Sequence, residues 1–476
     1  MLRTAEQYKE SLKDGRAVYL GGERVKDVTT HPILQIPVEH SAEMYRLAEI
    51  PELRGLFTAS LDGEPVSRYF LIPKSGQDLL LRRDIVEETT RRCGGTLNIV
   101  KAIGSDALFA LTLIAARMDR ELGTSSAERV ETYLRYCRQN DLALAVAQTD
   151  VKGDRSLRPH QQPDPDLYLR VVDRRADGIV VRGAKAHTTQ GPVANEIIAI
   201  PTRAMGEEDK EYAVAVAVPA NTKGLKFICR PTIPAEASFF DNPVSRRYIE
   251  TESLTVFDDV FVPWERVFLC GEWPFAGPLA VTFATFHRFT AVSYKPPIGD
   301  LFIGAAQLIA EMNGVDKASH IREKIARLIT YTEIIRACGK AAALDCRIVE
   351  GIAVPNPTMT NVGKYHFAVQ FHEAVALLQD IAGGLSITAP SEKELRNPET
   401  RAYLEKYLIG RSGVKAEDRL KVFHLIRDLT ASDFGGYNLV VSLHGEGSQQ
   451  AQLITTYRDY DLERCKRLVK ELLNIQ

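Results

Sequence analysis

Residues 167–181 read LYLRVVDRRADGIVV, and this stretch decides the fold class. Its two short apolar runs, Leu167–Val172 and Gly178–Val181, are rich in the β-branched residues that favour strands. Four further runs of this kind follow between glycines and prolines: Glu196–Pro201, Tyr212–Val218, Leu225–Cys229 and Glu252–Val262. The last run is interrupted at Asp258–Asp259, which predicts a turn. Short strands at this spacing predict a β-sandwich or a β-barrel.

Helical periodicity flanks this β-rich region on both sides. The segments before it are Glu43–Leu53, Gln77–Arg92, Ala107–Leu122 and Ser125–Gln139. Ser105 or Asp106 is expected to cap the third of these helices. The segments after Pro274 predict a bundle and are Asp300–Met312, Lys317–Glu350, Val362–Ala382, Ala416–Ala431 and Ser448–Leu473. The predicted class is α+β, with an N-terminal α-helical domain (1–145), a middle β domain (146–273) and a C-terminal helical bundle (274–476).

Composition excludes several classes of function. The chain has 476 residues, with 60 basic against 62 acidic side chains and a net charge of −2. A nearly neutral chain has no charge surplus with which to hold a polyphosphate backbone, so we expect no nucleic-acid partner. Met1–Arg16 is charged throughout, and the apolar stretch Ala107–Ala116 is about half as long as a bilayer span requires. The sequence therefore predicts a cytoplasmic protein without a membrane partner.

Short motifs narrow the possible sites further. The seven cysteines are an odd number and contain no C-x-x-C pair, which argues against a disulfide framework and a zinc ribbon. No G-x-G-x-x-G follows a predicted strand, and neither G-x-x-x-x-G-K-[ST] nor H-E-x-x-H occurs. A nicotinamide site of the Rossmann type and a metal site are therefore not indicated.

Several segments together resemble one flavoprotein family. They are Thr149–Pro159 (TDVKGDRSLRP), Asp164–Arg170, Asp177–His187, Val256–Pro263 (VFDDVFVP), Phe268–Glu272, His287–Arg288, Asp380–Gly384 and His444–Ser448 (HGEGS). This pattern closely resembles the family that unites 4-hydroxyphenylacetate 3-monooxygenase with 4-hydroxybutyryl-CoA dehydratase. The resemblance covers nearly the whole chain. It implies an acyl-CoA dehydrogenase-like architecture, FAD bound between the β domain and the bundle, and a homotetramer assembled through the bundle.

The chain departs from the dehydratase branch at the iron–sulfur cluster. That branch holds its cluster with three cysteines and one histidine, and only the histidine position is kept, as His287. The three cysteine positions read Asn98, Ala102 and Tyr294. The tyrosine of the dehydratase active site falls at Ala291, whereas its β-domain glutamate is kept as Glu252. The resemblance therefore implies a protein without an iron–sulfur cluster.

The chain also departs from the monooxygenase branch, at the residues that bind the phenol. The arginine, tyrosine and histidine of that branch fall at Ile103, Ala107 and Val146. A phenol hydroxylase needs a donor or a base at the substrate oxygen, which leaves His287, Arg288 or Tyr294 to supply it. Asp106 belongs to the same predicted substrate pocket, although it is most simply a helix cap.

The resemblance assigns cofactor contacts to three segments. The KGDR loop contributes Lys152, Gly153, Asp154 and Arg155, where glycine permits close backbone approach; the alternative is a solvated turn. Side chains at the isoalloxazine edge would be Gln148, Thr149, Thr188 and Thr189, although a threonine in a strand is normally only a strand former. The third segment would bind the pyrophosphate through His444, Gly445, Glu446, Gly447 and Ser448, unless Ser448 is simply a helix cap.

Three residues are candidates for catalysis. His287 and Arg288 occupy the active-site position of the family, although a histidine between Phe286 and Phe289 is often only a core residue. Glu252 would be a buried carboxyl with a raised pKa, suited to acid–base chemistry, or else an exposed residue at the start of a strand.

The leading hypothesis is a two-component monooxygenase. It would receive reduced FAD from a separate flavin reductase and oxygenate an aromatic or related small molecule. A second hypothesis is a cluster-free flavin enzyme acting on an acyl-CoA ester as isomerase, lyase or dehydrogenase, with Glu252 or His287 as its base. A third is a flavin-binding homologue that has lost its activity.

Overall fold

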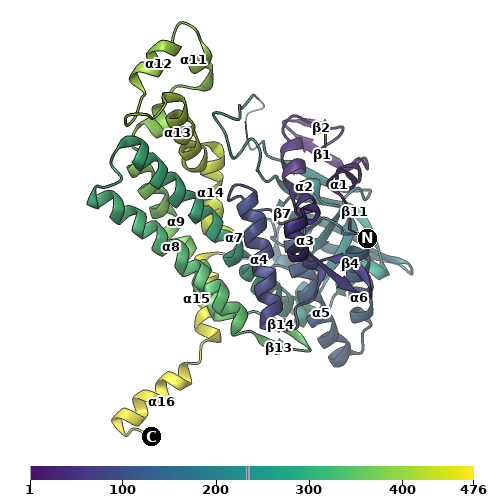
Figure 1. Ribbon diagram of the computed structural model, residues 1–476. Helices are drawn as coiled ribbons and strands as arrows, with labels where there is room; N and C mark the ends of the chain where they lie inside the picture. The colour runs from purple at the N-terminus through teal and green to yellow at the C-terminus, as the bar shows by residue number, and fades with distance from the viewer. Residues whose placement is uncertain (1, 232, 234–235) are drawn as a thin grey trace.

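The computed structural model describes residues 2–231, 233 and 236–476. Figure 1 shows the long C-terminal helices on one side of the molecule and the strands on the other. The N-terminal helices lie between these two parts, so the architecture is mixed α+β. Among the described residues, no helix combines the length and the apolar character needed to cross a membrane.

The N-terminal helices match the sequence prediction in part. The single helix expected at Glu43–Leu53 is divided at Ile50 between two helices, and α5 begins earlier than expected. The helices are α1 (Ala5–Glu10), α2 (Gln35–Glu49), α3 (Pro51–Phe57), α4 (Gly76–Arg92), α5 (Ala102–Leu122) and α6 (Ser126–Gln139). Helix α5 begins before Ser105 and Asp106, so the prediction that one of them caps it is wrong. Ser105 instead bonds back to the carbonyl of Lys101 (2.8 Å), and Asp106 binds Arg82.

The strands form open sheets. The six-stranded sheet has the order β2 (Glu23–Val25), β1 (Ala17–Leu20), β10 (Leu225–Cys229), β11 (Glu252–Pro263), β7 (Gly178–Thr189) and β6 (Arg170–Arg174). The four-stranded sheet has the order β12 (Val267–Cys270), β9 (Val214–Pro219), β8 (Glu196–Ala199) and β5 (Leu144–Ala147). Small hairpins pair β3 (Thr58–Leu61) with β4 (Glu64–Ser67) and β13 (Arg347–Val349) with β14 (Ile352–Val354). The described strands do not close into the barrel that was one of the two expectations.

The predicted turn at Asp258–Asp259 is a bulge instead. Strand β11 continues through it, and its register against β7 shifts between Phe257 and Val260. The two aspartates face solvent, where Asp258 binds Lys226 and Asp259 binds Arg182, each at 2.7 Å. A bulge inserts residues without ending the strand, so the pairing that reaches Glu252 is preserved.

The C-terminal part is a bundle built on α7 (Ala276–Asn313), α8 (Ser319–Leu344) and α9 (Pro357–Ala382). The prediction that the first helix begins at Asp300 is wrong, because α7 passes through Pro296 and Pro297. Both prolines are buried, so packing against the neighbouring helices outweighs a cost of about 3 kcal/mol for an interior proline. The expected helix Lys317–Glu350 is also shorter, since α8 ends at Leu344 and the β13–β14 hairpin follows.

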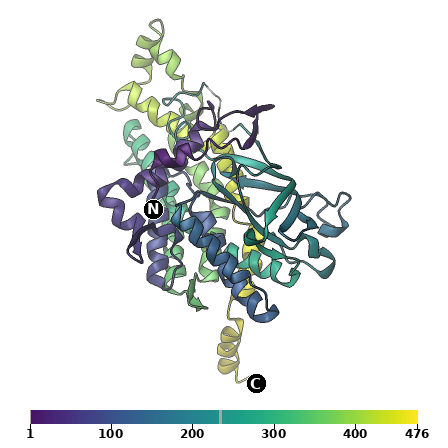
Figure 2. The same ribbon diagram turned by 90° about the vertical axis from the view of Figure 1, so that its right-hand side faces the viewer.

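The chain then continues through α10 (Leu385–Thr388), α11 (Glu392–Arg396), α12 (Arg401–Tyr407), α13 (Ala416–Thr430) and α14 (Asp433–His444). The last predicted helix is in fact two helices, α15 (Gln449–Asp459) and α16 (Leu462–Leu473), because Asp461 caps a new helix through the backbone N–H of Arg464 (2.9 Å). Helix α15 packs on α9, whereas α16 extends away from the body of the molecule in Figures 1 and 2.

Candidate active site

The ends of β5 and β7 bring two of the predicted cofactor segments together. The backbone N–H of Ala186 donates to the carbonyl of Thr149 at 2.9 Å. Lys185 is buried, and its Nζ donates to the Gln148 carbonyl (3.0 Å) and to Asp150 Oδ1 (2.6 Å). A buried ammonium group needs such partners, so Lys185 fixes the segment after β5 against β7. Gln148 and Thr149 therefore lie beside the strand that ends at Thr189.

The KGDR loop follows directly and requires its glycine. Gly153 has φ of +52°, and a Cβ atom there would lie 2.5 Å from Gln162 Oε1. Gln162 Oε1 accepts the backbone N–H of Asp154 (3.1 Å), which closes the turn. The side chains of Lys152, Asp154 and Arg155 are exposed, so they are free to meet a ligand or solvent.

The HGEGS segment approaches the same place from the C-terminal part. Burial lowers the pKa of His187, and the nearby charges of Lys152 and His444 lower it further. Lys152 of the KGDR loop and His444 of the HGEGS segment therefore both lie near His187. As predicted, Ser448 caps α15 by accepting the backbone N–H of Ala451 (3.3 Å).

Glu252 lies at the start of β11, opposite Thr189. Its Oε1 accepts hydrogen bonds from Thr189 Oγ1 (2.7 Å) and from the Tyr437 hydroxyl (2.8 Å). Burial raises the pKa of Glu252 to about 7, and these two hydrogen bonds oppose the rise. Of the two alternatives left open by the sequence, the geometry supports the buried carboxyl. Such a group can give or take a proton near neutral pH.

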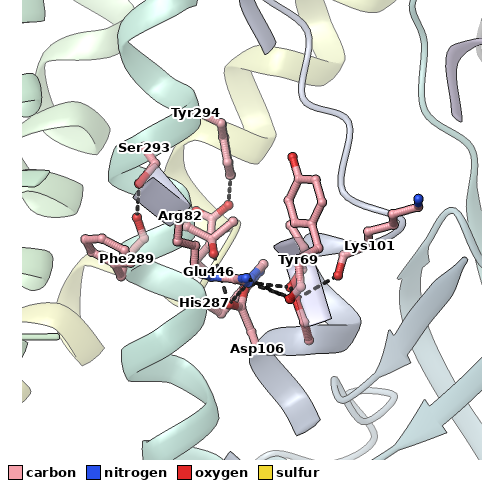
Figure 3. A network of polar contacts seen from close by, with 12 residues as sticks. Tyr69, Arg82, Lys101, Asp106, His287, Phe289, Ser293, Tyr294 and Glu446 are labelled. Carbon is pink, nitrogen blue, oxygen red and sulfur yellow. Dashed lines mark hydrogen bonds and ion pairs between the residues drawn. The ribbon is translucent and has the colours of Figure 1, made fainter. Parts of the chain in front are cut away.

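Glu446 forms a second buried network, although it was predicted only as part of an anion-binding loop. Its carboxyl accepts a hydrogen bond from the Tyr294 hydroxyl (Figure 3). It also binds Lys295 Nζ at 3.1 Å. Lys364 Nζ lies 3.7 Å from the same carboxyl. Burial raises the pKa of Glu446 to about 8 and lowers that of Lys364 to about 7. The network therefore has two groups that change charge near neutral pH.

Arg288 holds the backbone of this segment in place. Its Nε donates to the carbonyl of Glu446 (2.9 Å), and its Nη1 donates to Asn361 Oδ1 (2.8 Å). Gly447 has φ of +98°, and a Cβ atom there would lie 2.8 Å from Arg288 Nη2. Arg288 therefore stabilises the backbone turn of the HGEGS segment.

His287 is oriented by Asp106, as Figure 3 shows. Its Nδ1 lies 3.3 Å from Asp106 Oδ2, and its ring stacks on Phe283 with centroids 5.2 Å apart. Asp106 is fully buried, and its other oxygen accepts from Arg82 (2.6 Å) and Thr290 (3.0 Å). Asp106 thus binds Nδ1 of the His287 ring, and the other ring nitrogen, Nε2, is left for another partner.

A cavity of about 50 Å³, partly open to solvent, adjoins these groups. Its polar lining includes Glu250, Tyr294, Lys295, Tyr437 and Asn438. Its apolar walls come from α7, α9, α13 and α14 and from the segment around Leu97. Of the residues predicted for the substrate pocket, Tyr294 is the one that borders this cavity.

The other predicted pocket residues lie elsewhere. Ile103, Ala107 and Val146 belong to one apolar cluster and are at most 8% exposed. Asp106 is on the same helix as the first two and turns toward His287. The structure thus places Thr149, Lys152 and His444 near the end of β7. Four of the five predicted pocket residues do not line the cavity beside Tyr294.

Sequence reasoning missed Glu250, Lys295, Lys364 and Tyr437. One signal was present: Glu250 and Glu252 are two residues apart at the start of a strand, a spacing that favours one face. No comparable pattern marks Tyr437, because its partners are almost 190 residues away in sequence.

The residues around Thr189 fit a flavin. Gln148 and Thr149 lie beside β7, which ends at Thr189. The amide of Gln148 and the hydroxyls of Thr149 and Thr189 can each donate and accept hydrogen bonds. An isoalloxazine edge presents alternating donors and acceptors, so these three side chains have the chemistry needed to bind it.

Comparisons with known proteins cover the whole chain. The family model described as 4-hydroxyphenylacetate 3-hydroxylase N terminal matches residues 4–269, and the corresponding C-terminal model matches residues 276–474. The chain is 35% identical to a 4-hydroxybutyryl-CoA dehydratase/vinylacetyl-CoA-Delta-isomerase of Clostridium aminobutyricum, over 100% of both chains. It is 33% identical to the oxygenase component of 4-hydroxyphenylacetate 3-monooxygenase of Thermus thermophilus, over 99% of this chain and 98% of the relative.

Solved structures give relatives of the same two kinds, dehydratase and monooxygenase. An oxygen-tolerant archaeal 4-hydroxybutyryl-CoA dehydratase from N. maritimus superposes with a TM-score of 0.94 at 36% identity, over 100% of this chain and 96% of the other. The 4-hydroxyphenylacetate 3-monooxygenase oxygenase component complexed with FAD and 4-hydroxyphenylacetate superposes with a TM-score of 0.93 at 32% identity, over 99% and 98%. A glutaryl-coenzyme A dehydrogenase is similar in fold alone, with a TM-score of 0.50 at 12% identity over 93% and 87% of the two chains.

Proposed function

The chain belongs to the 4-hydroxyphenylacetate 3-hydroxylase family, and we propose that it is an FAD-dependent, two-component monooxygenase acting on an aromatic or related small molecule. The membership confirms the family resemblance found in the sequence. The activity is proposed from the relatives described as oxygenase components, which match almost the full chain. A partly apolar cavity with convergent polar groups and buried acid–base residues beside it is the kind of place where a small-molecule site forms.

The observation that carries this proposal is the near-complete superposition on an oxygenase component complexed with FAD and 4-hydroxyphenylacetate. Within this chain, the residue best suited to support the reaction is Glu252. It is a buried carboxyl with a pKa of about 7, and it binds Thr189, one of the residues proposed to contact the cofactor. A proton can be held there without a full charge at neutral pH. This arrangement suits a reaction that must move a proton next to a redox cofactor in a site protected from water.

The overall reaction balances with known components. When bound, reduced FAD supplies the two electrons with which one atom of O2 enters a substrate C–H bond and the other atom leaves as water. The chain would hold the cofactor edge through Gln148, Thr149 and Thr189. Glu252 would exchange the proton, and His287, oriented by Asp106, would present Nε2 as a hydrogen-bond partner.

The experiment is oxygen uptake by the purified protein with chemically reduced FAD and a panel of phenols. Product formation in proportion to oxygen consumed supports the proposal, and Glu252→Gln should reduce it strongly. Glu265→Gln, a change at an exposed carboxylate near the end of the same strand, is the matched control. Oxygen uptake that yields only hydrogen peroxide with every phenol would contradict the proposal.

We also propose a separate flavin reductase as the electron source. This chain has no nicotinamide-binding motif of the Rossmann type, and relatives are named as the oxygenase component of a monooxygenase. The test is whether NADH drives turnover only after an unrelated flavin reductase is added.

A homotetramer in the cytoplasm remains our proposal for the assembled protein. Helix α16 supports the oligomer, because it leaves Leu468, Leu472 and Leu473 between 58% and 80% exposed. An amphipathic helix standing away from its own subunit needs another surface to cover its apolar face. Removal of the residues after Tyr460 should lower the mass measured by light scattering without unfolding the subunit.

A second candidate is a redox-neutral reaction on an acyl-CoA ester. It is favoured by the relative named 4-hydroxybutyryl-CoA dehydratase/vinylacetyl-CoA-Delta-isomerase at 35% identity. Glu252 and the neighbouring Glu250 would serve as the base and acid of a proton shift between two carbons. Because Asn98, Ala102 and Tyr294 replace the cluster cysteines expected from the dehydratase branch, such a reaction would proceed without an iron–sulfur cluster.

Exchange of substrate protons for deuterium distinguishes the two candidates. Anaerobic incubation of the flavin-loaded protein with an unsaturated acyl-CoA should incorporate deuterium at carbon only if the second candidate is correct. A protein that binds flavin but shows neither oxygenation nor exchange would instead support the third hypothesis, an inactive flavin-binding homologue.

A further inference from the structure

Tyr437 joins the two buried glutamates at the start of β11. Its hydroxyl lies 2.8 Å from Glu252 Oε1 and 3.1 Å from Glu250 Oε2. Glu252 also binds Thr189, whereas Glu250 lines the cavity. One continuous line of hydrogen bonds therefore runs from Thr189 at the cofactor side to the cavity.

The number of protons on the three groups determines which group donates in each hydrogen bond. A tyrosine hydroxyl has one proton, so it can donate to only one of the two carboxyl groups at a time. The other contact requires a protonated carboxyl that donates to the phenol oxygen. Burial and the charge of Glu252 raise the pKa of Glu250 well above its usual value, which makes Glu250 the protonated partner. Tyr437 then donates to Glu252.

Each of the two glutamate carboxyl groups has one oxygen atom without a hydrogen-bond partner among the described residues. These two atoms, Glu250 Oε1 and Glu252 Oε2, are both buried. Glu250 is 5% exposed and borders the cavity. Asn438 Nδ2 and Thr96 Oγ1, which belong to other residues of the cavity wall, are also buried without a partner. The cavity thus has a polar corner with capacity to bind water or a small acid.

We propose that Glu250, Tyr437 and Glu252 form a proton relay that connects the Thr189 side of the site to this cavity. In one transfer, the Glu250 proton moves to the Tyr437 oxygen while the Tyr437 proton moves to Glu252. Glu250 becomes a carboxylate that accepts a proton from the cavity, and Glu252 becomes the acid beside Thr189. No oxidant or reductant is needed, and one proton crosses the relay.

The surrounding charges allow the relay to move in both directions. Glu250 faces Glu446 and Lys295, whose effects on its pKa are opposed. Glu252 faces Cys229, whose thiol is kept neutral because burial raises its pKa to about 12. Neither end of the relay therefore has a fixed, unopposed counter-ion. The relay depends on the proposed function in one respect only, namely the reaction that uses the proton delivered beside Thr189.

Infrared titration of the protein without substrate tests the relay. The carbonyl stretch of a protonated carboxyl should persist above neutral pH for Glu250 and disappear near pH 7 for Glu252. Glu250→Gln should remove only the persistent band. Tyr437→Phe removes a donor to Glu252 and should raise the proton affinity of Glu252 by about tenfold, as expected for one hydrogen bond to an ionised group.

Matched controls separate the relay from a general change in structure. Tyr457→Phe, at a tyrosine 71% exposed on α15, should leave both bands unchanged. Glu252→Gln should remove the band with its midpoint near pH 7, which assigns that band. If Tyr437→Phe and Glu250→Gln both leave the Glu252 midpoint unchanged, the three groups are uncoupled and the relay is wrong. This readout is independent of oxygenation, so a failure of the proposed activity does not affect it.

Discussion

The buried carboxyl of Glu252 makes the stability of the protein depend on pH. A carboxyl with a raised pKa is held neutral in the folded state, so its contribution is fully present below the unfolded pKa and is lost as pH rises through the folded pKa. For Glu252 the range runs from the usual value of 4.5 to about 7. At about 1.36 kcal/mol for each tenfold change in proton affinity, the full cost of ionising it is about 3.4 kcal/mol.

Glu252→Gln removes this dependence while it retains the shape of the side chain. Integrating the two titrations predicts that, between about pH 5 and about pH 8, the wild type loses about 2.5 kcal/mol of unfolding free energy relative to the variant. Urea unfolding at both values measures the difference for each protein. The control Glu265→Gln changes an exposed carboxylate and should follow the wild type.

The test compares the change in unfolding free energy between the two pH values in the wild type with the same change in Glu252→Gln. This comparison is needed because other groups titrate in the same pH range in both proteins. A loss of stability with rising pH that is the same in the wild type and in Glu252→Gln would refute the reasoning. It would mean that Glu252 is ionised at ordinary pH and reaches solvent in the folded protein.

Three further substitutions test the surroundings of the site. Gly153→Ala places a methyl group at positive φ, which should cost about 1–2 kcal/mol of stability and weaken FAD binding measured by flavin fluorescence. Gly447→Ala should weaken FAD binding as well, because the new Cβ atom would lie 2.8 Å from the guanidinium of Arg288, which holds the HGEGS turn. The control is Gly436→Ala, where a Cβ atom meets nothing within 4 Å, and this variant should bind FAD normally. Asp106→Asn removes the charge that pairs with Arg82 and should lower the unfolding free energy by about 3–5 kcal/mol in urea titrations; an unchanged midpoint would argue against a buried ion pair there.

The sequence predicted the elements whose signals are local. The runs Leu225–Cys229 and Glu252–Val262 became strands β10 and β11 almost residue for residue, and α4 ends at Arg92 as expected. The errors occurred where tertiary packing overrides a local signal. Two consecutive prolines did not end α7, and the aspartate pair in β11 made a bulge because both carboxylates find cationic partners on neighbouring strands.

The candidate site was predictable only where its residues belong to a local sequence motif. The KGDR and HGEGS segments have recognisable motifs, and Lys152 and His444 of these segments both lie near His187 on β7. The partners of Glu252 and Glu446 were not predictable, because Tyr437, Lys295 and Lys364 come from distant helices and carry no motif. Which buried groups meet is decided by how the bundle packs on the sheet.

The most direct test of the central claim follows the oxygen atom. The protein is loaded with reduced FAD under argon, mixed with a phenol panel, and exposed to isotopically heavy O2, and the products are examined by mass spectrometry. The account predicts a hydroxylated product that contains one heavy oxygen atom for each FAD oxidised, and much less of it from Glu252→Gln. Complete oxidation of FAD with every phenol recovered unchanged would contradict it.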